Sequence, residues 1–428
     1  MARDQVRPTP RALPAAHLPA VYQRWKWRVL LVYAGFYLFQ YMGRFHLAQV
    51  AALVMADLHI DHYTIGWITA LLYWGFMAGD VVHGRLGEIY GLRLWVTLGA
   101  LLTTLCNWLA SCSVSAVTLA VPWCLNGFVN AACWSPGISL LAQWWPRRER
   151  GQAMGIVGMA AGLAMLLMWL VSGWVGARFG WRTAFRYPPL LIGLSGVIYF
   201  LLVRDRPTDI GLPEYIEDDQ LSRAAEATGA QHLHGFGPYK LLLSNPQFLL
   251  ASHVKGLENV VRYGLVTWIP LYYFEAAGLQ MQSTILFTTA LPLGYVLAPL
   301  CAGVISDRLL HSARRPMVLL SAAVSALALL GIALLPPSKV SIGATLLFIG
   351  SFAMSLSPMA AMAVDIAGRH MSGTASGILD AHGYLYAGLQ AVVFGVLLHM
   401  AGSPWPLVFL LMAGTRVLCG MLIFFVRA

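Results

Sequence analysis

The chain has 428 residues, of which 58% are hydrophobic and only 11% are charged, and its formal net charge is +10. Soluble domains usually carry about 25% charged residues, so this composition excludes an ordinary soluble protein and indicates a membrane protein. Apolar segments recur along the whole chain, each close to the ~20 residues that a helix needs to span hydrocarbon. Most arginines lie in short loops between these segments, so the positive charge indicates membrane orientation rather than nucleic-acid binding.

Length and apolarity predict an all-α membrane protein with twelve transmembrane helices in two pseudo-symmetric six-helix bundles. The expected spans are 28–55, 63–83, 93–113, 116–140, 151–176, 183–203, 247–275, 281–304, 315–335, 340–364, 371–400 and 404–426. The longest polar stretch separates the two groups of six. We therefore expect an N-terminal segment at 1–27, a first bundle at 28–203, a linker at 204–244 and a second bundle at 245–428.

The distribution of basic residues predicts the orientation of these helices. Loops on one side carry most of the lysines and arginines, whereas the loops at 57–61 and 111–115 carry none. By the positive-inside rule, both termini and the linker are cytoplasmic, and the protein crosses the inner membrane many times. One loop contradicts the rule, because an even number of spans places its arginines outside; they are Arg178, Arg182 and Arg186.

The six cysteines lie in apolar segments and lack metal-ligand spacing. We therefore expect neither a metal site nor a disulfide framework. We also expect no cofactor.

Two arginines inside apolar segments are the strongest functional signal in the chain. Arg44 and Arg262 each lie in the first predicted span of one half. An arginine near the bilayer centre costs at least ~2.5–3.5 kcal/mol on insertion scales, so it normally faces a polar cavity. Two similar glycine motifs are separated along the chain by nearly the same distance as the two arginines. They are Gly151-Gln-Ala-Met-Gly155 and Gly373-Thr-Ala-Ser-Gly377. A duplicated unit with an arginine at equivalent places predicts a central site for an anion.

The loop after the second span, Gly84-Arg-Leu-Gly-Glu-Ile-Tyr-Gly-Leu-Arg93, resembles the loop between helices two and three of the major facilitator superfamily. Its glycines let helix ends approach closely, and an acid such as Glu88 near the next helix N-terminus is favoured by the helix dipole and can pair with a nearby arginine. Gly303-Val-Ile-Ser-Asp307-Arg308 repeats the device in the second half. The resemblance implies the fold of that superfamily and a conformational motif made of Gly84, Glu88, Arg93, Asp307 and Arg308.

A narrower resemblance covers most of the chain. It rests on four segments: Trp144-Trp145-Pro-Arg-Arg-Glu149-Arg150-Gly151, Arg204-Asp-Arg-Pro-Thr-Asp-Ile-Gly211, Arg262-Tyr263-Gly264 continuing to Trp268 and Pro270, and Gly373-Thr-Ala-Ser-Gly377 leading to Gly383-Tyr384. Together they resemble the organophosphate:phosphate antiporter family, which includes the bacterial glycerol-3-phosphate and hexose-phosphate transporters. The motifs are specific for the family and say little about the substrate.

In that family one arginine from the first helix of each half coordinates the phosphate, and the resemblance implies this role for Arg44 and Arg262. It also implies that Tyr37, Tyr41 and Tyr384 line the cavity. Helical spacing places Tyr37, Tyr41 and Arg44 on one face, at i, i+4 and i+7. A guanidinium fork suits bidentate binding of a phosphate or a carboxylate.

Span seven carries charges of its own. Glu258 and Arg262 are at i and i+4, and Lys255 and Glu258 are at i and i+3, so both pairs are expected to meet on the helix surface. These charged side chains either neutralise one another or contact the substrate, and the sequence leaves both possibilities open. We include Lys255 in the expected substrate-binding set and Glu258 in the set that balances charge.

Two positions depart from the family pattern. Glycerol-phosphate transporters have a lysine in helix two and a histidine in helix five that help to hold the phosphate, and the aligned residues here are Asp80 and Ala161. The site is then less cationic, so a monocarboxylate or a zwitterionic metabolite is an alternative to an organophosphate. In span eleven, Asp380 and His382 stand where the family motif usually has uncharged residues, and with Asp80 they are candidates for proton coupling.

The expected function is transport of a small anionic organic metabolite by alternating access, with phosphate or protons as the coupling species, as an antiporter or a symporter. An intramembrane enzyme would need a converging nucleophile–base set or metal ligands, and the sequence offers none. A transporter-like ligand sensor is the other alternative, because some members of the family sense ligands. We expect a monomer in the lipid bilayer with no nucleic-acid partner.

Overall fold

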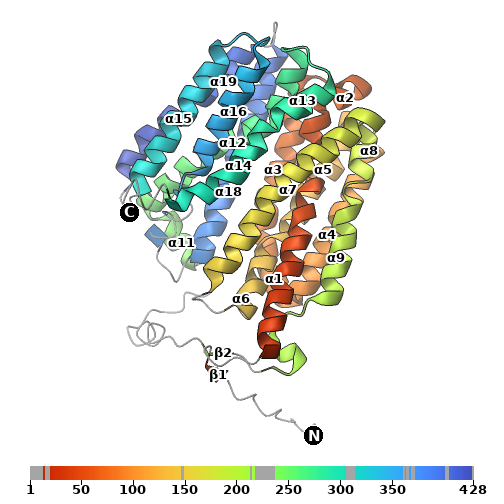
Figure 1. Ribbon diagram of the computed structural model, residues 1–428, viewed down its shortest axis with the longest axis vertical. Helices are drawn as coiled ribbons and strands as arrows, with labels where there is room; N and C mark the ends of the chain where they lie inside the picture. Colours follow the sequence, from red (N-terminus) through yellow and green to blue (C-terminus); the bar gives the residue numbers. More distant parts are fainter. Residues whose placement is uncertain are drawn as a thin grey trace.

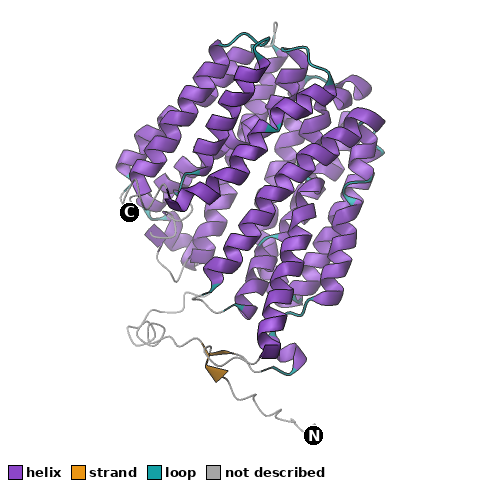
Figure 2. Cartoon of the chain, viewed as in Figure 1, coloured by secondary structure: helices purple, strands orange, loops and turns teal. Residues whose placement is uncertain are grey.

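The chain folds into a bundle of long helices that run roughly side by side (Figures 1 and 2). The computed structural model describes residues 13–14, 20–145, 149–212, 215–216, 237–304, 314–359, 362, 366–367, 372–400 and 404–426. Helix α1 begins and helix α19 ends at the lower end in Figure 1, which we call the terminal end. The opposite end, which carries the loop around residues 58–62, is called the far end.

In the part of the first half that the structure describes there are nine α-helices, and several predicted spans are split in two. They are α1 (Ala20–Gln40), α2 (His46–Leu58), α3 (His62–Tyr90), α4 (Leu92–Ser111), α5 (Ala116–Asn130), α6 (Ser135–Trp144), α7 (Arg150–Phe179), α8 (Trp181–Arg186) and α9 (Leu190–Leu202). Short 3-10 turns at Tyr41–Gly43 and Ala131–Cys133 replace α-helix at two of the breaks. The helices of this half pack mainly against one another.

The described residues of the second half form seven helices, which likewise pack mainly against one another. They are α12 (Pro246–Glu275), α13 (Met281–Thr288), α14 (Ala290–Val304), α15 (Arg314–Leu334), α16 (Val340–Ser355), α18 (Ser372–His399) and α19 (Trp405–Leu422). The chain between the halves holds a 3-10 turn (Pro207–Ile210) and the short helix α11 (Gly237–Leu243). Outside the bundle, β1 (Leu13–Pro14) pairs in parallel with β2 (Tyr215–Ile216).

Nine helical segments in the described part of the chain are long and apolar enough to cross a membrane. The remaining three predicted spans coincide with α1 and α2, with α12, and with α16. These three are more polar or shorter than such a segment usually is. Together the helices follow the predicted spans in order along the chain, so the all-α membrane fold is confirmed.

The main contacts between the two halves join four pairs of helices: α3 with α18, α7 with α13, α7 with α14, and α2 with α12. The closest is between α3 and α18, where Gly66 faces the backbone of α18. A Cβ atom at Gly66 would lie 2.5 Å from the carbonyl oxygen of Ala391, so only glycine allows this approach. Farther along, the Trp74 indole donates a hydrogen bond to the carbonyl of Leu385 at 3.3 Å.

At the far end, two histidine–carboxylate pairs connect the halves. Nε2 of His62, at the start of α3, lies 3.0 Å from a carboxylate oxygen of Glu275, at the end of α12. Nδ1 of His399, at the end of α18, lies 3.0 Å from a carboxylate oxygen of Asp61, which caps α3. We call these four residues the far-end latch.

The three arginines that we expected outside, against the positive-inside rule, have structural partners at the far end. Arg182 donates to the Asp57 carboxylate at 2.5 Å and to the Ser113 carbonyl at 3.0 Å. Arg186 donates from Nε to the Ser111 hydroxyl at 2.9 Å, and the Arg178 guanidinium lies 5.8 Å from the Trp174 ring centre. The hydrogen bond from Arg182 lowers the pKa of Asp57 below its usual range.

At the terminal end, the loop between α3 and α4 is fixed by the chain that follows α9. The backbone N–H of Arg93 donates to the Asp205 carboxylate at 2.6 Å, and its guanidinium donates to the Val203 carbonyl at 3.2 Å. Asp205, which follows α9, therefore lies at the N-terminus of α4. We expected Glu88 to be the acid that is favoured by the helix dipole there. Burial raises the pKa of Asp205, and the Arg93 N–H opposes that rise.

Candidate functional site

Arg44 lies in a break of the first helix rather than on a continuous helical face. Its φ of −138° takes it out of the helical range between the 3-10 turn and α2. The break leaves the Gly43 carbonyl without a helical partner, and it accepts side-chain N–H groups from Asn126 at 2.6 Å and Asn107 at 3.2 Å. The prediction that Tyr37, Tyr41 and Arg44 share one regular helix face was therefore wrong, because asparagines of two other helices replace the helical hydrogen bonds.

Arg44 is only 5% exposed, and its guanidinium sits among aromatic rings. Its central carbon lies 4.1 Å from the Tyr41 ring centre, 4.8 Å from that of Phe45 and 4.9 Å from that of Phe76. One terminal nitrogen donates to the Tyr384 hydroxyl at 3.3 Å, which links the first half of the chain to α18. The Nε atom is buried without a hydrogen-bond acceptor.

Arg262 occupies the middle of α12 and borders a cavity of about 180 Å³ between the halves. Its guanidinium lies 4.9 Å from the ring centre of Tyr295 on α14. In the described part of the chain, neither Arg262 nor Arg44 forms an ion pair with a carboxylate. Both arginines therefore keep their charge available.

A cluster of tyrosines lies between the two arginines. The charges of Arg44 and Arg262 both act on Tyr41, Tyr263 and Tyr384. The Tyr263 and Tyr384 ring centres are 5.6 Å apart. Of these three, the sequence did not single out Tyr263 as a site residue, although it directly follows Arg262. Tyr37 lies one step away, with its ring centre 5.9 Å from that of Tyr41.

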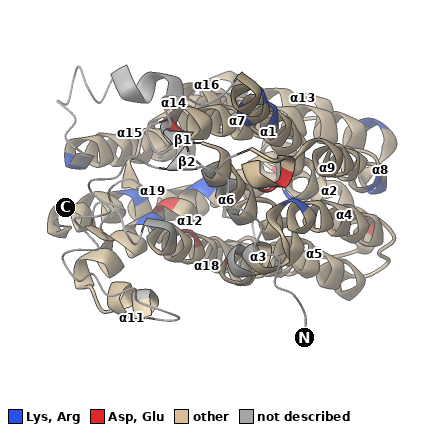
Figure 3. Ribbon diagram, turned by 90° about the horizontal axis from the view of Figure 1, so that it is seen from below, with Lys and Arg blue, Asp and Glu red and all other residues tan. Residues whose placement is uncertain are grey.

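The cavity combines small residues of α7 with charged residues of the second half. It is lined by Gly158, Ala161, Gly162, Met165, Lys255, Glu258, Asn259, Arg262, Tyr295, Met354, Ser355, Ser357 and Arg416. Figure 3 shows basic and acidic residues close together beside α12 and α19. Ala161, where the resemblance led us to look for a histidine, borders the cavity from α7 and adds no charge.

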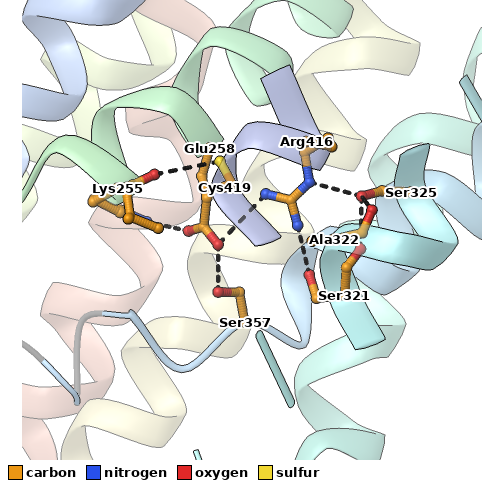
Figure 4. A network of polar contacts seen from close by, with 9 residues as sticks. Lys255, Glu258, Ser321, Ala322, Ser325, Ser357, Arg416 and Cys419 are labelled. Carbon is orange, nitrogen blue, oxygen red and sulfur yellow. Dashed lines mark hydrogen bonds and ion pairs between the residues drawn. The ribbon is translucent and has the colours of Figure 1, made fainter. Parts of the chain in front are cut away.

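Glu258 pairs with Arg416 and Lys255, so the expected pair with Arg262 was wrong. Its carboxylate lies 3.5 Å from an Arg416 nitrogen and 4.0 Å from the Lys255 ammonium, and it accepts a hydrogen bond from Ser357 at 2.5 Å. Arg416 comes from α19 and is fully buried (Figure 4). We had not named Arg416 as a site residue, although a lone arginine in an apolar span was the signal that identified Arg44.

Two carboxyl groups, one from each half, lie near the arginines. Asp80 on α3 is within electrostatic range of Asp380 on α18 and of Arg44. Asp380 in turn is within range of Lys255 and Arg262. Neither carboxyl forms a hydrogen bond or ion pair in the part of the chain that the structure describes.

Other predicted residues lie outside this group or outside the described part. His382 bonds through Nδ1 to the Ile378 carbonyl at 2.9 Å, and its ring centre is 5.5 Å from that of His253. Gly84 lies within α3, but the side chain of Glu88 is outside the described part of the structure. Asp307 and Arg308 also lie outside the described residues.

A larger cavity of about 460 Å³ lies at the far end of the second half. Tyr272, Trp405 and Phe409 give it an aromatic wall. Its charged residue, Glu275, belongs to the far-end latch, so this cavity offers an anion no cationic side chain. The smaller, cationic cavity is the candidate site.

Comparison with known proteins identifies the family of the chain. The family model of the Major Facilitator Superfamily matches residues 33–385 and 284–428. The membrane sensor protein UhpC of Escherichia coli is 28% identical over 379 residues, which cover 87% of this chain and 86% of the relative. A probable hexose phosphate transport protein of Chlamydia muridarum is 26% identical and covers 86% of this chain and 84% of the relative. The glycerol-3-phosphate transporter of Bacillus subtilis is 23% identical, with 87% and 86% covered.

Solved structures show the same fold. A bacterial homologue of the lysosomal transporter Spinster, in an inward-facing and occupied conformation, superposes with a TM-score of 0.74 at 15% identity, covering 94% of this chain and 97% of that chain. A D-xylose–proton symporter superposes with a TM-score of 0.73 at 16% identity, with the same coverage. These proteins are membrane transporters rather than enzymes. The chain belongs to the major facilitator superfamily and, within it, is similar to members of the organophosphate:phosphate antiporter type.

Proposed function

We propose that this protein transports a small phosphorylated organic anion, and that Arg44 and Arg262 bind its phosphate group from the two halves. One observation carries the proposal: in the described chain neither arginine forms an ion pair with a carboxylate, and both act on the same three tyrosines. A guanidinium in a low-dielectric site that is not paired directly with a carboxylate is arranged to receive an anion. Lys255, on the same cavity wall as Arg262, supplies a third cation.

The charge of the cavity suits a phosphate monoester. Lys255, Arg262 and Arg416 contribute three positive charges, and Glu258 contributes one negative charge. A phosphate monoester carries about −1.5 to −2 charges at neutral pH, so it matches this surplus better than a monocarboxylate does when Asp80 and Asp380, which do not line the cavity, are protonated. The names of the relatives point to the same class, since they include hexose phosphate and glycerol-3-phosphate transporters.

Binding across the two halves supplies a mechanism for alternating access. An anion that contacts Arg44 from one half and Arg262 from the other stabilises a conformation in which the two are close. We assign residues 28–203 and 245–428 to the two moving bundles, with 204–244 as connector. We place the terminal end, with its many basic residues, in the cytoplasm of a bacterial inner-membrane protein.

Coupling is assigned to the two carboxyl groups. Asp80 and Asp380 approach one another from opposite bundles, near the arginines, and are not neutralised by an ion pair in the described chain. A change in the distance between the bundles alters their mutual repulsion and thereby their affinity for a proton. Proton symport is our assignment, and exchange with inorganic phosphate is the alternative.

Binding and flux measurements test the proposal. Purified protein should bind glycerol 3-phosphate or glucose 6-phosphate more tightly than acetate or lactate, as measured by calorimetry. Arg44→Lys and Arg262→Lys should each weaken binding by about 10- to 100-fold, because lysine keeps the charge but loses the planar fork. Arg178→Lys, at the far end and away from the cavity, is the matched control and should bind normally. Normal binding by either site variant would contradict the proposed anion site.

A sensor is the second candidate function, favoured by one relative. The E. coli relative is named a membrane sensor protein and matches most of both chains. Flux separates the two functions, because a transporter moves its ligand across a proteoliposome membrane. Tight binding of a phosphorylated ligand with no uptake in proteoliposomes would support the sensor and reject the transporter, and would leave the binding site itself intact.

A further inference from the structure

The polar network beside Arg262 is organised around Glu258 (Figure 4). On one side, Arg416 donates from Nε to the Ser325 hydroxyl at 2.7 Å and from Nη2 to the Ser321 hydroxyl at 2.8 Å. Its remaining nitrogen, Nη1, faces Glu258 at 3.5 Å. On the other side, the Lys255 ammonium lies 4.0 Å from the same carboxylate.

The two cations differ in how firmly they are held. Arg416 is fully buried, and two serines of α15 fix its orientation. The side chain of Lys255 is 18% exposed, lines the cavity and contacts Glu258 only at the limit of an ion pair. A buried arginine needs its carboxylate, whereas a partly solvated lysine on a flexible stem can exchange one oxygen ligand for another.

We propose that Glu258 is an internal counter-anion that holds Lys255 until the transported anion displaces it. Arg416 is a positioning residue, since it keeps Glu258 at the cavity wall but donates its hydrogen bonds to Ser321 and Ser325. Lys255 passes from the Glu258 carboxylate to the bound anion and returns when the anion leaves. This role rests on the proposed function, because it needs an anion at Arg262.

The proposal fixes the sign of each mutational effect. Replacing Glu258 by glutamine removes the competitor, so an anion should bind more tightly even though Arg416 loses its ion pair. Two charges a few ångströms apart at a partly buried site interact strongly, so the affinity should rise by about fivefold or more. A merely structural role predicts the opposite sign, because a loosened network would weaken binding.

The other partners supply matched tests. Arg416→Gln releases Glu258 toward Lys255, so binding should weaken by about fivefold or more. Adding Glu258→Gln to that variant should restore binding to at least the wild-type affinity. Lys255→Met should weaken binding and should abolish the gain from Glu258→Gln, which makes the pair non-additive in a double-mutant cycle. Arg178→Gln, at the far end and outside both the cavity and the latch, is the control and should leave affinity unchanged.

The experiment is calorimetric titration of the purified full chain with glycerol 3-phosphate and with inorganic phosphate. Melting temperatures are measured alongside to show that each variant is folded. The Arg416→Gln and Glu258→Gln double variant keeps a neutral network, so it answers the question if Glu258→Gln alone does not fold. Tighter binding by the Glu258 variant that disappears without Lys255 supports the role. Unchanged or weaker binding overturns it while the proposed anion site stands. Absence of binding by the wild-type protein overturns both.

Discussion

The buried arginines of this protein are stabilised in two different ways. Arg416 donates hydrogen bonds to two serine hydroxyls and forms an ion pair with the Glu258 carboxylate. Arg44 is instead surrounded by three aromatic rings and has one hydroxyl acceptor. A cation–π contact contributes about 0.5–2 kcal/mol, so the rings offset much of the cost of placing Arg44 in the membrane. The rings do not accept hydrogen bonds from all the N–H groups of the guanidinium, whereas a bound anion would.

The two carboxyl groups near the arginines give a prediction about coupling. Like charges from opposite halves repel, so one of Asp80 and Asp380 should take up a proton when the bundles bring them together. Asp80→Asn or Asp380→Asn should therefore flatten the pH dependence of uptake in proteoliposomes. Asp57→Asn is the control. The hydrogen bond from Arg182 lowers the pKa of Asp57, so this carboxylate does not take up a proton near neutral pH. If both site variants keep the wild-type pH profile, exchange without these protons is the better mechanism.

The site residues that could be predicted from the sequence are charged residues within apolar membrane spans. Arg44 and Arg262 were found because each interrupts an apolar segment, and Arg416 carries the same signal in the last span. The partner of Glu258 was not predictable from helical spacing. That spacing favoured Arg262, but the actual pair joins α12 to α19, and only the packing of helices far apart in the sequence decides it.

The break between α1 and α2 is the element that positions Arg44. The Gly43 carbonyl receives two asparagine side chains, and the space around its Cα is filled. A Cβ atom there would lie 2.7 Å from a Thr103 methyl and 2.8 Å from an Ile192 methyl. The broken geometry therefore depends on a residue without a side chain.

Gly43→Ala should destabilise the protein by about 1–3 kcal/mol, since it overfills a packed site. It should also weaken binding of a phosphorylated ligand, because it displaces the adjacent arginine. Gly35→Ala is the matched control on the same span, where nothing lies within 4 Å of the added carbon. That change should be neutral or stabilising by up to ~1 kcal/mol. Thermal unfolding with and without glycerol 3-phosphate measures both, and equal behaviour of the two variants would argue against the role of the break.

The helices themselves were largely predictable, and their breaks were not. The predicted span 247–275 corresponds to α12 (Pro246–Glu275), and 93–113 to α4 (Leu92–Ser111), because length and apolarity set these limits. The first span was predicted as continuous. Its interruption is stabilised by Asn107 and Asn126 from two later helices, and the local sequence contains no signal of them.

At the scale of the whole molecule, the far-end latch joins the two halves. Exposed ion pairs contribute about 0.2–1 kcal/mol each, so loss of both pairs should shift the balance toward opening at the far end by roughly two- to thirtyfold. We expect His62→Ala with His399→Ala to increase labelling of a cysteine placed at Thr69, a buried position of α3. Arg178→Ala, at the same end but outside the latch, is the control. Unchanged labelling in the double variant would show that the latch does not hold the halves together.

The latch also predicts a pH effect. Burial opposes ionisation of Asp61, but hydrogen bonds from Thr64 and the nearby His399 lower its pKa overall. The contribution of this carboxylate to the latch is therefore present above the usual pKa range of an aspartate and is lost as the pH falls through its lowered pKa. Strong acid should weaken the pair with His399 and speed labelling at position 69. Asp61→Asn should remove this dependence on pH, and an unchanged profile in that variant would contradict the role of Asp61.

The orientation of the whole bundle can be tested with a native cysteine. Cys112 follows α4 at the far end and is exposed, whereas Cys106, Cys133 and Cys419 are buried. The positive-inside rule places this end outside the cell, and the partners of Arg182 and Arg186 give these arginines a structural reason to be there. A membrane-impermeant maleimide should therefore label intact spheroplasts at Cys112, and Cys112→Ser should remove that label. Labelling of Cys112 only after permeabilisation would invert the topology, place both termini outside, and make the arginine-rich far-end loop the true cytoplasmic signal.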